Sequence, residues 1–114
     1  MTNDTLSYLK DLKDLTIPAA RISNEGLAKI AHLKSIKRLS LQGCKDITDE
    51  GLVHLTHCWR LEYVFLDSTP VTDKGLKHLV QLSKLEALSL KDTAVSNGGA
   101  LLLRLQRPNC KVTR

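Results

Sequence analysis

Hydrophobic and polar positions alternate along four short segments of the chain. In each segment two aliphatic residues stand one residue apart, at Leu15/Ile17, Leu39/Leu41, Val64/Leu66 and Leu88/Leu90. Alternation over so short a span is typical of a β-strand with one buried face. We therefore expect four strands that direct these aliphatic side chains into a core.

Each alternating segment is followed by a pair of residues typical of a helix start. A hydroxyl residue precedes Asn or Asp at Ser23-Asn24, Thr48-Asp49, Thr72-Asp73 and Ser96-Asn97. A side-chain oxygen at such a position can accept a hydrogen bond from a free helical N–H, and the sequence leaves open which residue of the pair is the cap. Apolar residues then recur three apart at Leu27, Ile30 and Leu33, at Leu52, Leu55 and Cys58, and at Leu76, Leu79 and Leu82. This spacing predicts short helices that each bury one stripe.

Together the strand and helix patterns form a unit that occurs four times. The copies "ISNEGLAKI", "ITDEGLVHL", "VTDKGLKHL" and "VSNGGALLL" begin at Ile22, Ile47, Val71 and Val95. The period is therefore 25, 24 and 24 residues. A single unit of this size cannot bury its own apolar stripe, so neighbouring units must stack.

The segment "LSLQGCKDITDEGL" is similar to the leucine-rich repeat, in the cysteine-containing subtype of F-box-associated and ribonuclease-inhibitor-like proteins. The resemblance covers almost the whole chain and implies an α/β solenoid, a short horseshoe with parallel strands on its concave face and helices on its convex face. Only Cys44 occupies the cysteine position of the motif, which Ala20, Thr69 and Thr93 take in the other copies. No F-box segment precedes the repeats in this sequence, so the resemblance does not imply a role in ubiquitin ligation.

With 114 residues, the chain is expected to form one domain over residues 1–114. Leu6, Leu9 and Leu12 continue the three-apart stripe and predict an N-terminal capping helix over residues 3–12. We expect repeats over about 12–35, 36–60, 61–84 and 85–107, and a closing strand over 108–114. Within that strand, Cys110 is expected to occupy the position of Leu39 and Leu88.

Composition and the N-terminus place the chain among intracellular proteins. Hydrophobic residues make up 42% and charged residues 25%, as in ordinary globular domains, and no run approaches the length of a membrane span. Asp4, Asp11 and the lack of early arginines argue against a secretory signal or transit peptide. Three cysteines without a C-x-x-C pair favour a reducing compartment. The cytoplasm is the first expectation, and the mitochondrion and nucleus remain open.

The residues that could serve catalysis or metal binding all occupy positions for which the repeat pattern already gives a structural role. In "HLTHC" the frame directs His54 and His57 outward and Cys58 inward, whereas zinc ligands must converge, so we expect no metal site. Cys44, Cys58 and Cys110 align with leucine or small-residue positions and are expected to be reduced and buried. We interpret Asp49 and Asp73 as helix-capping residues. No nucleophile, base or phosphate-loop motif is present in the sequence, so we expect a non-catalytic protein without a cofactor.

The concave face is the candidate binding surface. Polar-face strand positions should form columns across the sheet: Asp14, Arg38, Tyr63 and Ala87; Thr16, Ser40, Phe65 and Ser89; Pro18, Gln42, Asp67 and Lys91. Tyr63 and Phe65 should therefore lie side by side, exposed, in the middle of the face. They are two of only four aromatic residues in the chain. We expect them to anchor a protein partner, with the surrounding charges of Arg38, Glu62, Asp67 and Lys91 orienting it.

Two alternatives rest on other features. The net charge of +5 is compatible with a basic module that binds RNA or an acidic surface through Lys37, Arg38, Arg104, Arg107, Lys111 and Arg114. No nucleic-acid motif accompanies these residues, which disfavours nucleic acid. The combination "AVSNGG…PNCKV" is similar to mitochondrial leucine-rich proteins of the complex I distal-arm assembly and ATP synthase factor B group, which implies an assembly subunit of a larger complex. The identity of the partner and the oligomeric state stay open.

Overall fold

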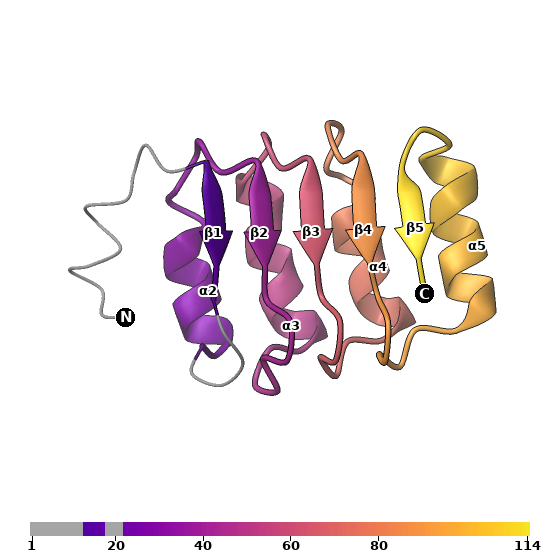
Figure 1. Cartoon of the computed structure of the whole chain (residues 1–114), viewed down its shortest axis with the longest axis horizontal. Helices are drawn as coiled ribbons and strands as arrows, with labels where there is room; N and C mark the ends of the chain where they lie inside the picture. Colours follow the sequence, from indigo (N-terminus) through magenta and orange to yellow (C-terminus); the bar gives the residue numbers. More distant parts are fainter. Residues whose placement is uncertain (1–12, 18–21) are drawn as a thin grey trace.

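The computed structural model describes residues 13–17 and 22–114, in which strands and helices alternate along the chain (Figure 1). The elements are β1 (Asp14–Thr16), α2 (Asn24–Ile30), β2 (Arg38–Ser40), α3 (Asp49–Leu52) with the 3-10 helix η1 (Val53–His57), β3 (Tyr63–Phe65), α4 (Asp73–Leu79), β4 (Ala87–Ser89), α5 (Asn97–Gln106) and β5 (Lys111–Thr113). The helix starts at Asn24, Asp49 and Asp73 are as predicted. The capping helix predicted over residues 3–12 lies outside the described residues.

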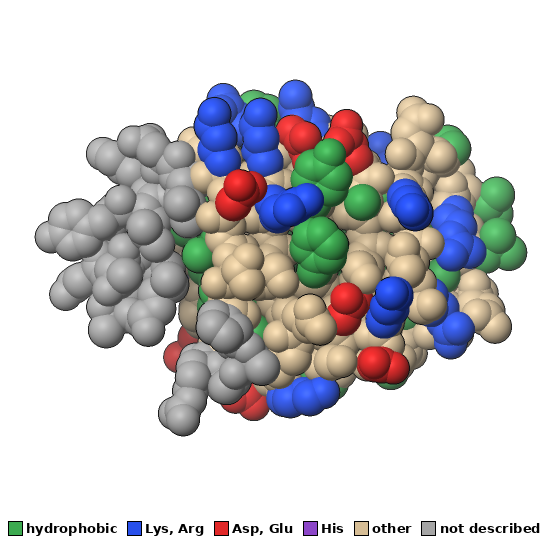
Figure 2. Space-filling view, in the orientation of Figure 1, with side chains coloured by type: hydrophobic (Ala, Val, Ile, Leu, Met, Phe, Trp, Pro, Cys, Tyr) green, Lys and Arg blue, Asp and Glu red, His purple; other side chains and the backbone are tan. Residues whose placement is uncertain are grey.

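All strand pairs are parallel, in the order β1-β2-β3-β4-β5. The register places Leu15, Leu39, Val64, Leu88 and Val112 opposite one another, so one column of aliphatic residues crosses the sheet. Helices α2, α3 and α4 lie behind the sheet and α5 lies beyond β5 (Figure 1). The side chains on the opposite side of the sheet form a surface that none of the described helices covers, which we call the open sheet face (Figure 2). The predicted α/β solenoid is confirmed.

The hydroxyl residue, rather than the Asn or Asp after it, is the helix cap. Ser23, Thr48, Thr72 and Ser96 all have extended backbone at the N-cap position. The side-chain oxygens of Ser23, Thr72 and Ser96 accept hydrogen bonds from backbone N–H groups in the first turn of their helices. This geometry resolves the alternative that the sequence leaves open.

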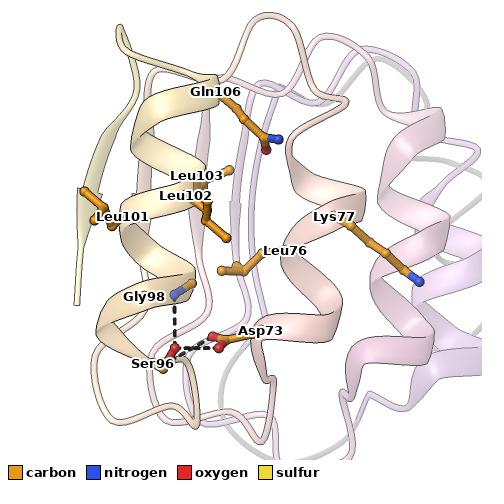
Figure 3. Close-up of a pocket in the computed structure, with 10 residues that line it drawn as sticks. Asp73, Leu76, Lys77, Ser96, Gly98, Leu101, Leu102, Leu103 and Gln106 are labelled. Atoms are coloured by element: carbon orange, nitrogen blue, oxygen red, sulfur yellow. Dashed lines mark hydrogen bonds between the residues drawn. The ribbon is translucent and has the colours of Figure 1, made fainter.

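The Asn and Asp side chains instead connect each repeat to the next one. Asn24 Oδ1 accepts from the Thr48 N–H at 3.0 Å. The Asp49 carboxylate accepts from the Thr72 N–H at 2.7 Å and from the Thr72 hydroxyl at 2.5 Å. Asp73 binds Ser96 in the same way, at 2.8 and 2.5 Å (Figure 3). The interpretation of Asp49 and Asp73 as caps of their own helices is therefore corrected: they hold the cap residue of the following helix.

This ladder of side chains requires a glycine in each following helix. A Cβ atom added to Gly75 would lie 2.6 Å from Asp49 Oδ1, closer than atoms can approach without displacement. A Cβ atom added to Gly51 would meet Asn24 in the same way, and one added to Gly99 would meet Asp73, both at even shorter distances. The glycine of the motif is thus the place where the preceding repeat inserts its polar side chain. The hydrogen bonds that Asp73 accepts from Ser96 hold the pKa of the Asp73 carboxyl below its usual value.

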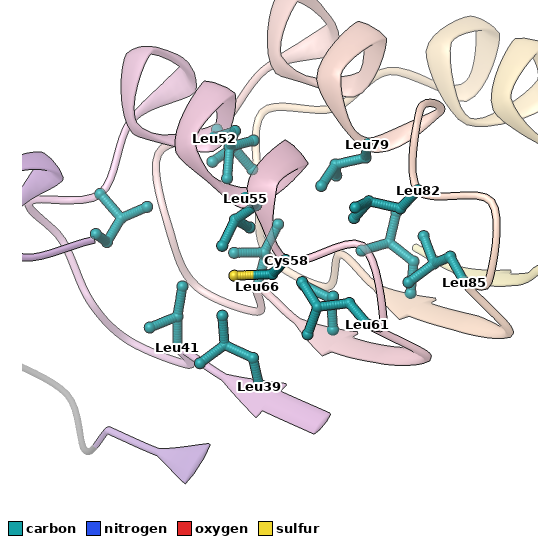
Figure 4. Packing of buried hydrophobic residues seen from close by; sticks show 14 of the residues in the cluster. Leu39, Leu41, Leu52, Leu55, Cys58, Leu61, Leu66, Leu79, Leu82 and Leu85 are labelled. Atoms are coloured by element: carbon teal, nitrogen blue, oxygen red, sulfur yellow. The ribbon is translucent and has the colours of Figure 1, made fainter. Parts of the chain in front are cut away.

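The helical stripes fill the space behind the sheet. Leu52, Leu55 and Cys58 are completely buried, and Figure 4 shows them facing the strand leucines. The single helix expected over this stripe is shorter than the pattern suggests, because α3 gives way to η1 after Leu52. A 3-10 helix has three residues per turn, so residues three apart face the same side. The tighter winding brings Leu55 and Cys58 to the core together.

The turn after each strand needs a backbone conformation that glycine adopts most easily. Gly43, Ser68 and Asp92 occupy equivalent positions and all have positive φ, at 78°, 59° and 57°. The next residue points inward, where the Cys44 thiol is 3.7 Å from the carbonyl oxygen of Ile17. In the following repeat the Thr69 hydroxyl donates to the Leu66 carbonyl at 2.7 Å. A small side chain that can donate locally therefore suits this buried position.

The last repeat departs from the prediction by two positions. Val112, not Cys110, lies opposite Leu88, although the predicted closing strand is present as β5. The Cys110 N–H donates to the Arg107 carbonyl, just as the Leu85 N–H donates to the Leu82 carbonyl. Cys110 thus replaces Leu85, and its expected equivalence with Leu39 and Leu88 is wrong. The connection from this residue into the strand is one residue shorter than in the repeat before.

Candidate functional site

Strand β3 carries the two aromatic side chains of the open sheet face. The register places Tyr63 opposite Arg38 and Phe65 opposite Ser40 on β2, as the predicted columns require. The Arg38 guanidinium carbon is 5.1 Å from the centre of the Tyr63 ring and 5.5 Å from that of Phe65. Both distances are within the range of a cation–π contact. In Figure 2, hydrophobic side chains and a basic side chain gather in the middle of this face.

The two rings are half-buried rather than fully exposed as predicted. The neighbouring side chains on β4, Ala87 and Ser89, are small and leave one side of the rings accessible. Arg38 covers part of the other side of the rings. Because the guanidinium is held by both rings, it presents its hydrogen-bond donors from a restricted set of positions. The result is a cationic and aromatic cluster formed by Arg38, Tyr63 and Phe65, which we call the aromatic cluster.

Two carboxylates border the aromatic cluster on the side where the strands begin. A hydrogen bond to Glu86 raises the pKa of the Tyr63 hydroxyl, and the negative charges of Glu86 and Glu62 act in the same direction. Glu62 also forms an ion pair with Lys37, at 3.8 Å. Glu86 therefore belongs to the site although the sequence analysis omitted it. Its alignment with Glu62 and Lys37, one residue before each strand, is the signal that could have identified it.

Asp67 and Lys91, the other two predicted site residues, lie where the strands end. Asp67 Oδ1 accepts from the Ser89 hydroxyl at 2.6 Å and from the Lys91 N–H at 2.9 Å. Asp67 is thus part of the connection between the third and fourth repeats, which limits its freedom to orient a partner. The Lys91 side chain is exposed. Of the predicted site, the structure brings Arg38, Tyr63 and Phe65 into one cluster and places Asp67 and Lys91 at its edge.

Three arginines of the alternative basic surface stabilise the C-terminal end of the fold. Arg104 donates to the Val112 carbonyl at 2.9 Å and Arg107 to the Val80 carbonyl at 2.6 Å. Arg114 donates to the Val95 carbonyl at 2.7 Å and to Asn97 Oδ1 at 2.6 Å. These contacts hold the three side chains against the end of the solenoid, and Arg114 closes the ladder of side chains at its last position.

The histidines and cysteine of "HLTHC" do not converge. Cys58 is completely buried, with its thiol 3.8 Å from the Ile30 carbonyl oxygen, whereas His57 is exposed. In the part of the chain that the structure describes, no group of three or more His, Cys, Asp or Glu side chains is arranged to hold a metal ion.

The same part of the chain contains no helix long and apolar enough to cross a membrane.

All three thiols are expected to react slowly in the folded protein. Cys44, Cys58 and Cys110 are buried and form no disulfide, and burial raises the pKa of Cys58 to about 11 and also raises that of Cys110. At about pH 8 only about one Cys58 side chain in a thousand is then the reactive thiolate. Labelling with a chromogenic aromatic disulfide should therefore be slow in buffer and complete in concentrated guanidinium chloride. Rapid labelling of three thiols in buffer would show that they are accessible.

A hollow of about 650 Å³ lies between α4 and α5, where Leu76 and Leu102 point toward each other (Figure 3). Next to it, α5 exposes Leu101, Leu102 and Leu105 by 53%, 62% and 69%. Only Ala100 and Leu103 of this helix are buried, since none of the elements that the structure describes packs against its outer side. The apolar run "ALLLRL" therefore covers more of the helix surface than one packed face requires.

Comparison with known proteins agrees with this architecture. A family model of the leucine-rich repeat matches residues 32–55. The structure of leiomodin-1 actin-binding site 2 aligns with a TM-score of 0.75 and 16% identity, over 96% of this chain and 76% of the other. The Mex67:Mtr2 subunits of Chaetomium align with 0.69 and 16%, over 97% of this chain and 86% of the other. The chain folds as a leucine-rich-repeat solenoid.

A leucine-rich-repeat protein of Leptospira interrogans has the same fold, with a TM-score of 0.68 and 20% identity. That alignment covers all of this chain but only 28% of the Leptospira protein. No curated protein sequence matches the chain. At these identities the similarities establish the fold, and the function must be argued from the surfaces of this chain.

Proposed function

We propose that the leucine-rich-repeat domain is a non-catalytic interaction module that binds a protein partner through its open sheet face. The observation that carries the proposal is the position of the Arg38 guanidinium over both Tyr63 and Phe65. Tyrosine and arginine are enriched among the residues that dominate binding energy at protein interfaces. Here the arginine stands on β2 and the tyrosine on the middle strand β3, together with a phenylalanine that the buried core does not use.

The arrangement also lowers the entropic cost of binding. Immobilising a free arginine at an interface costs about 0.5–1.5 kcal/mol, and the two rings already restrict Arg38. The sheet beneath is rigid because each strand is bonded to its neighbours and the buried column crosses all of them. A partner would therefore meet a preformed surface. The structural relatives support this role to the extent that one of them is named as an actin-binding site.

The charges around the aromatic cluster would orient the partner. Glu62 and Glu86 lie where the strands begin, and Asp67 and Lys91 lie where they end. Such rim charges act mainly on the association rate and on the choice of partner. The alternative basic surface is less favoured, because Arg104, Arg107 and Arg114 already donate to oxygens of the fold.

The proposal is tested by crosslinking followed by a binding measurement. A photo-reactive phenylalanine analogue at position 65 should capture a partner from the source cell, and the same analogue at Val53, on the helix side, should not. For the purified partner, Tyr63→Ala/Phe65→Ala should weaken binding by about 30-fold or more. The melting temperature should change little, because both side chains lie outside the buried core.

Two results would contradict the proposal. The double variant could keep full affinity while Arg104→Glu/Arg107→Glu abolishes binding, which would place the site at the basic end. Alternatively, Val53→Ala could weaken binding as much as the aromatic variant, which would place it on the helices. A binding constant that falls steeply with salt concentration would accompany the first of these results.

A further inference from the structure

The chain's single tryptophan lies outside both the core and the aromatic cluster. Trp59 stands in the turn between η1 and β3 and is 49% exposed. The corresponding turns are built identically: Ile36, Leu61 and Leu85 each donate their N–H to the carbonyl three residues earlier. At the position of Trp59 the neighbouring repeats have Lys34 and Ser83. The turn therefore requires no aromatic residue, and its presence in one repeat needs another explanation.

Cationic side chains surround the indole. The Arg60 guanidinium carbon is 4.7 Å from its centre and the Lys84 ammonium 5.7 Å. Lys34 of the preceding repeat donates to the His57 carbonyl at 3.3 Å, which holds its ammonium at the same edge of the solenoid. We call Lys34, Trp59, Arg60 and Lys84 the tryptophan edge.

Two carboxylates lie near this edge. Glu62 pairs with Lys37, Glu86 is hydrogen-bonded to Tyr63, and both line a hollow together with Lys84. Within the described part of the chain, none of the three cations of the tryptophan edge forms an ion pair with a carboxylate. The edge therefore combines an accessible apolar ring with three cations that form no ion pair.

We infer that the tryptophan edge binds an acidic peptide segment of a partner protein, in which carboxylates flank an apolar side chain. The carboxylates would pair with Arg60, Lys84 and Lys34, and the apolar side chain would lie against the exposed part of the indole. Neighbouring parallel strands are about 4.8 Å apart, so the repeats of Lys34 and Lys84 are about 10 Å apart. An extended peptide rises about 3.3 Å per residue, so carboxylates three positions apart, with apolar residues between them, span this distance.

A nucleic acid fits this edge less well. A nucleobase binds a tryptophan by stacking on its ring, and two cations already lie over the Trp59 ring. A base would have to displace one of them, whereas a carboxylate can pair with each cation in place. The cation–π contacts also restrict the indole and its two neighbours before a ligand arrives, which reduces the entropic cost of binding.

Intrinsic fluorescence provides a direct test, because Trp59 is the only tryptophan of the chain. The probe is a synthetic peptide with Glu at every third position and Leu between, compared with the same peptide in which Gln replaces Glu. The acidic peptide should shift the emission of Trp59 to shorter wavelength with saturation, and the Gln peptide should not. Binding of a single-stranded uridine oligonucleotide without binding of the acidic peptide would overturn the inference in favour of nucleic acid.

Variants show whether this edge is the site, with affinity measured by the anisotropy of the labelled peptide. Trp59→Ser introduces the residue that the next repeat has at this position, and Arg60→Ser/Lys84→Ser introduces the residue found at 35. Each should weaken binding by about tenfold or more. The matched control Lys29→Ala/Lys74→Ala removes two exposed charges from α2 and α4 and should have less than about a threefold effect.

The experiment also separates this inference from the proposed function. Phe65→Ala should leave peptide affinity unchanged, because the aromatic cluster is a different surface and Tyr63 keeps its hydrogen bond to Glu86. Loss of peptide binding in that variant would move the acidic ligand to the open sheet face and overturn the inference. An equal loss in the Lys29→Ala/Lys74→Ala control would do the same, since it would show attraction by net charge alone.

Discussion

Replacing Leu55 with alanine is expected to lower the free energy of unfolding by about 2–5 kcal/mol. Leu55 is completely buried at the centre of η1, among the other leucines and Cys58 of the middle repeats (Figure 4). The substitution removes three carbon atoms from a site that is packed on all sides, and a rigid sheet and two neighbouring helices limit how far the cavity can collapse. In a domain of this size the loss is a large part of the total stability.

The control for this substitution is the neighbouring Val53→Ala, also in η1. Val53 is 41% exposed, so its truncation should change the free energy of unfolding by less than about 0.5 kcal/mol. Both variants can be compared by urea unfolding followed by circular dichroism. If Leu55→Ala unfolds at the same urea concentration as the parent, Leu55 does not support the interface between repeats.

The repeat pattern was sufficient to predict the strands and the helix starts. The pair Leu39/Leu41 and the pair Thr48-Asp49 each recur with nearly the same spacing, so four weak signals agree on one arrangement. Once the strands are parallel and in phase, the columns of the open sheet face follow, and the neighbourhood of Arg38, Tyr63 and Phe65 with them. Periodicity thus predicts which residues are neighbours across the sheet.

Periodicity does not predict where a long side chain extends. Asp49 has the sequence position of a helix-capping residue, but its carboxylate reaches Thr72 because stacking places the next helix start within 3 Å. The position of Arg38 over two rings depends in the same way on its rotamer. Cys110 was misaligned because an alternating pattern does not distinguish registers that differ by two residues: Cys110 and Val112 are both buried, and it is Val112 that pairs with Leu88.

The ladder of side chains leads to the last prediction, which concerns a residue without a side chain. Gly75→Ala is expected to lower the free energy of unfolding by about 2–4 kcal/mol. Its Cβ would lie 2.6 Å from both Asp49 Oδ1 and Leu52 Cδ1, so one or both must move. Displacing Asp49 breaks its two hydrogen bonds to Thr72, each worth about 1.5–3 kcal/mol for a charged acceptor, and the higher helix propensity of alanine offsets part of the loss.

Gly98→Ala is the matched control, because Gly98 also lies in the first turn of a helix but has space around it. The nearest atom to its added Cβ would be Ser96 Oγ at 3.8 Å, so alanine should raise the stability by about 0.5–1 kcal/mol. Thermal unfolding should therefore show shifts of opposite sign for the two variants. In an Asp49→Ala background, Gly75→Ala should cost less than in the parent, since the carboxylate that it displaces is gone. Equal costs in both backgrounds would mean that the clash is with Leu52 and that the ladder does not explain the glycine.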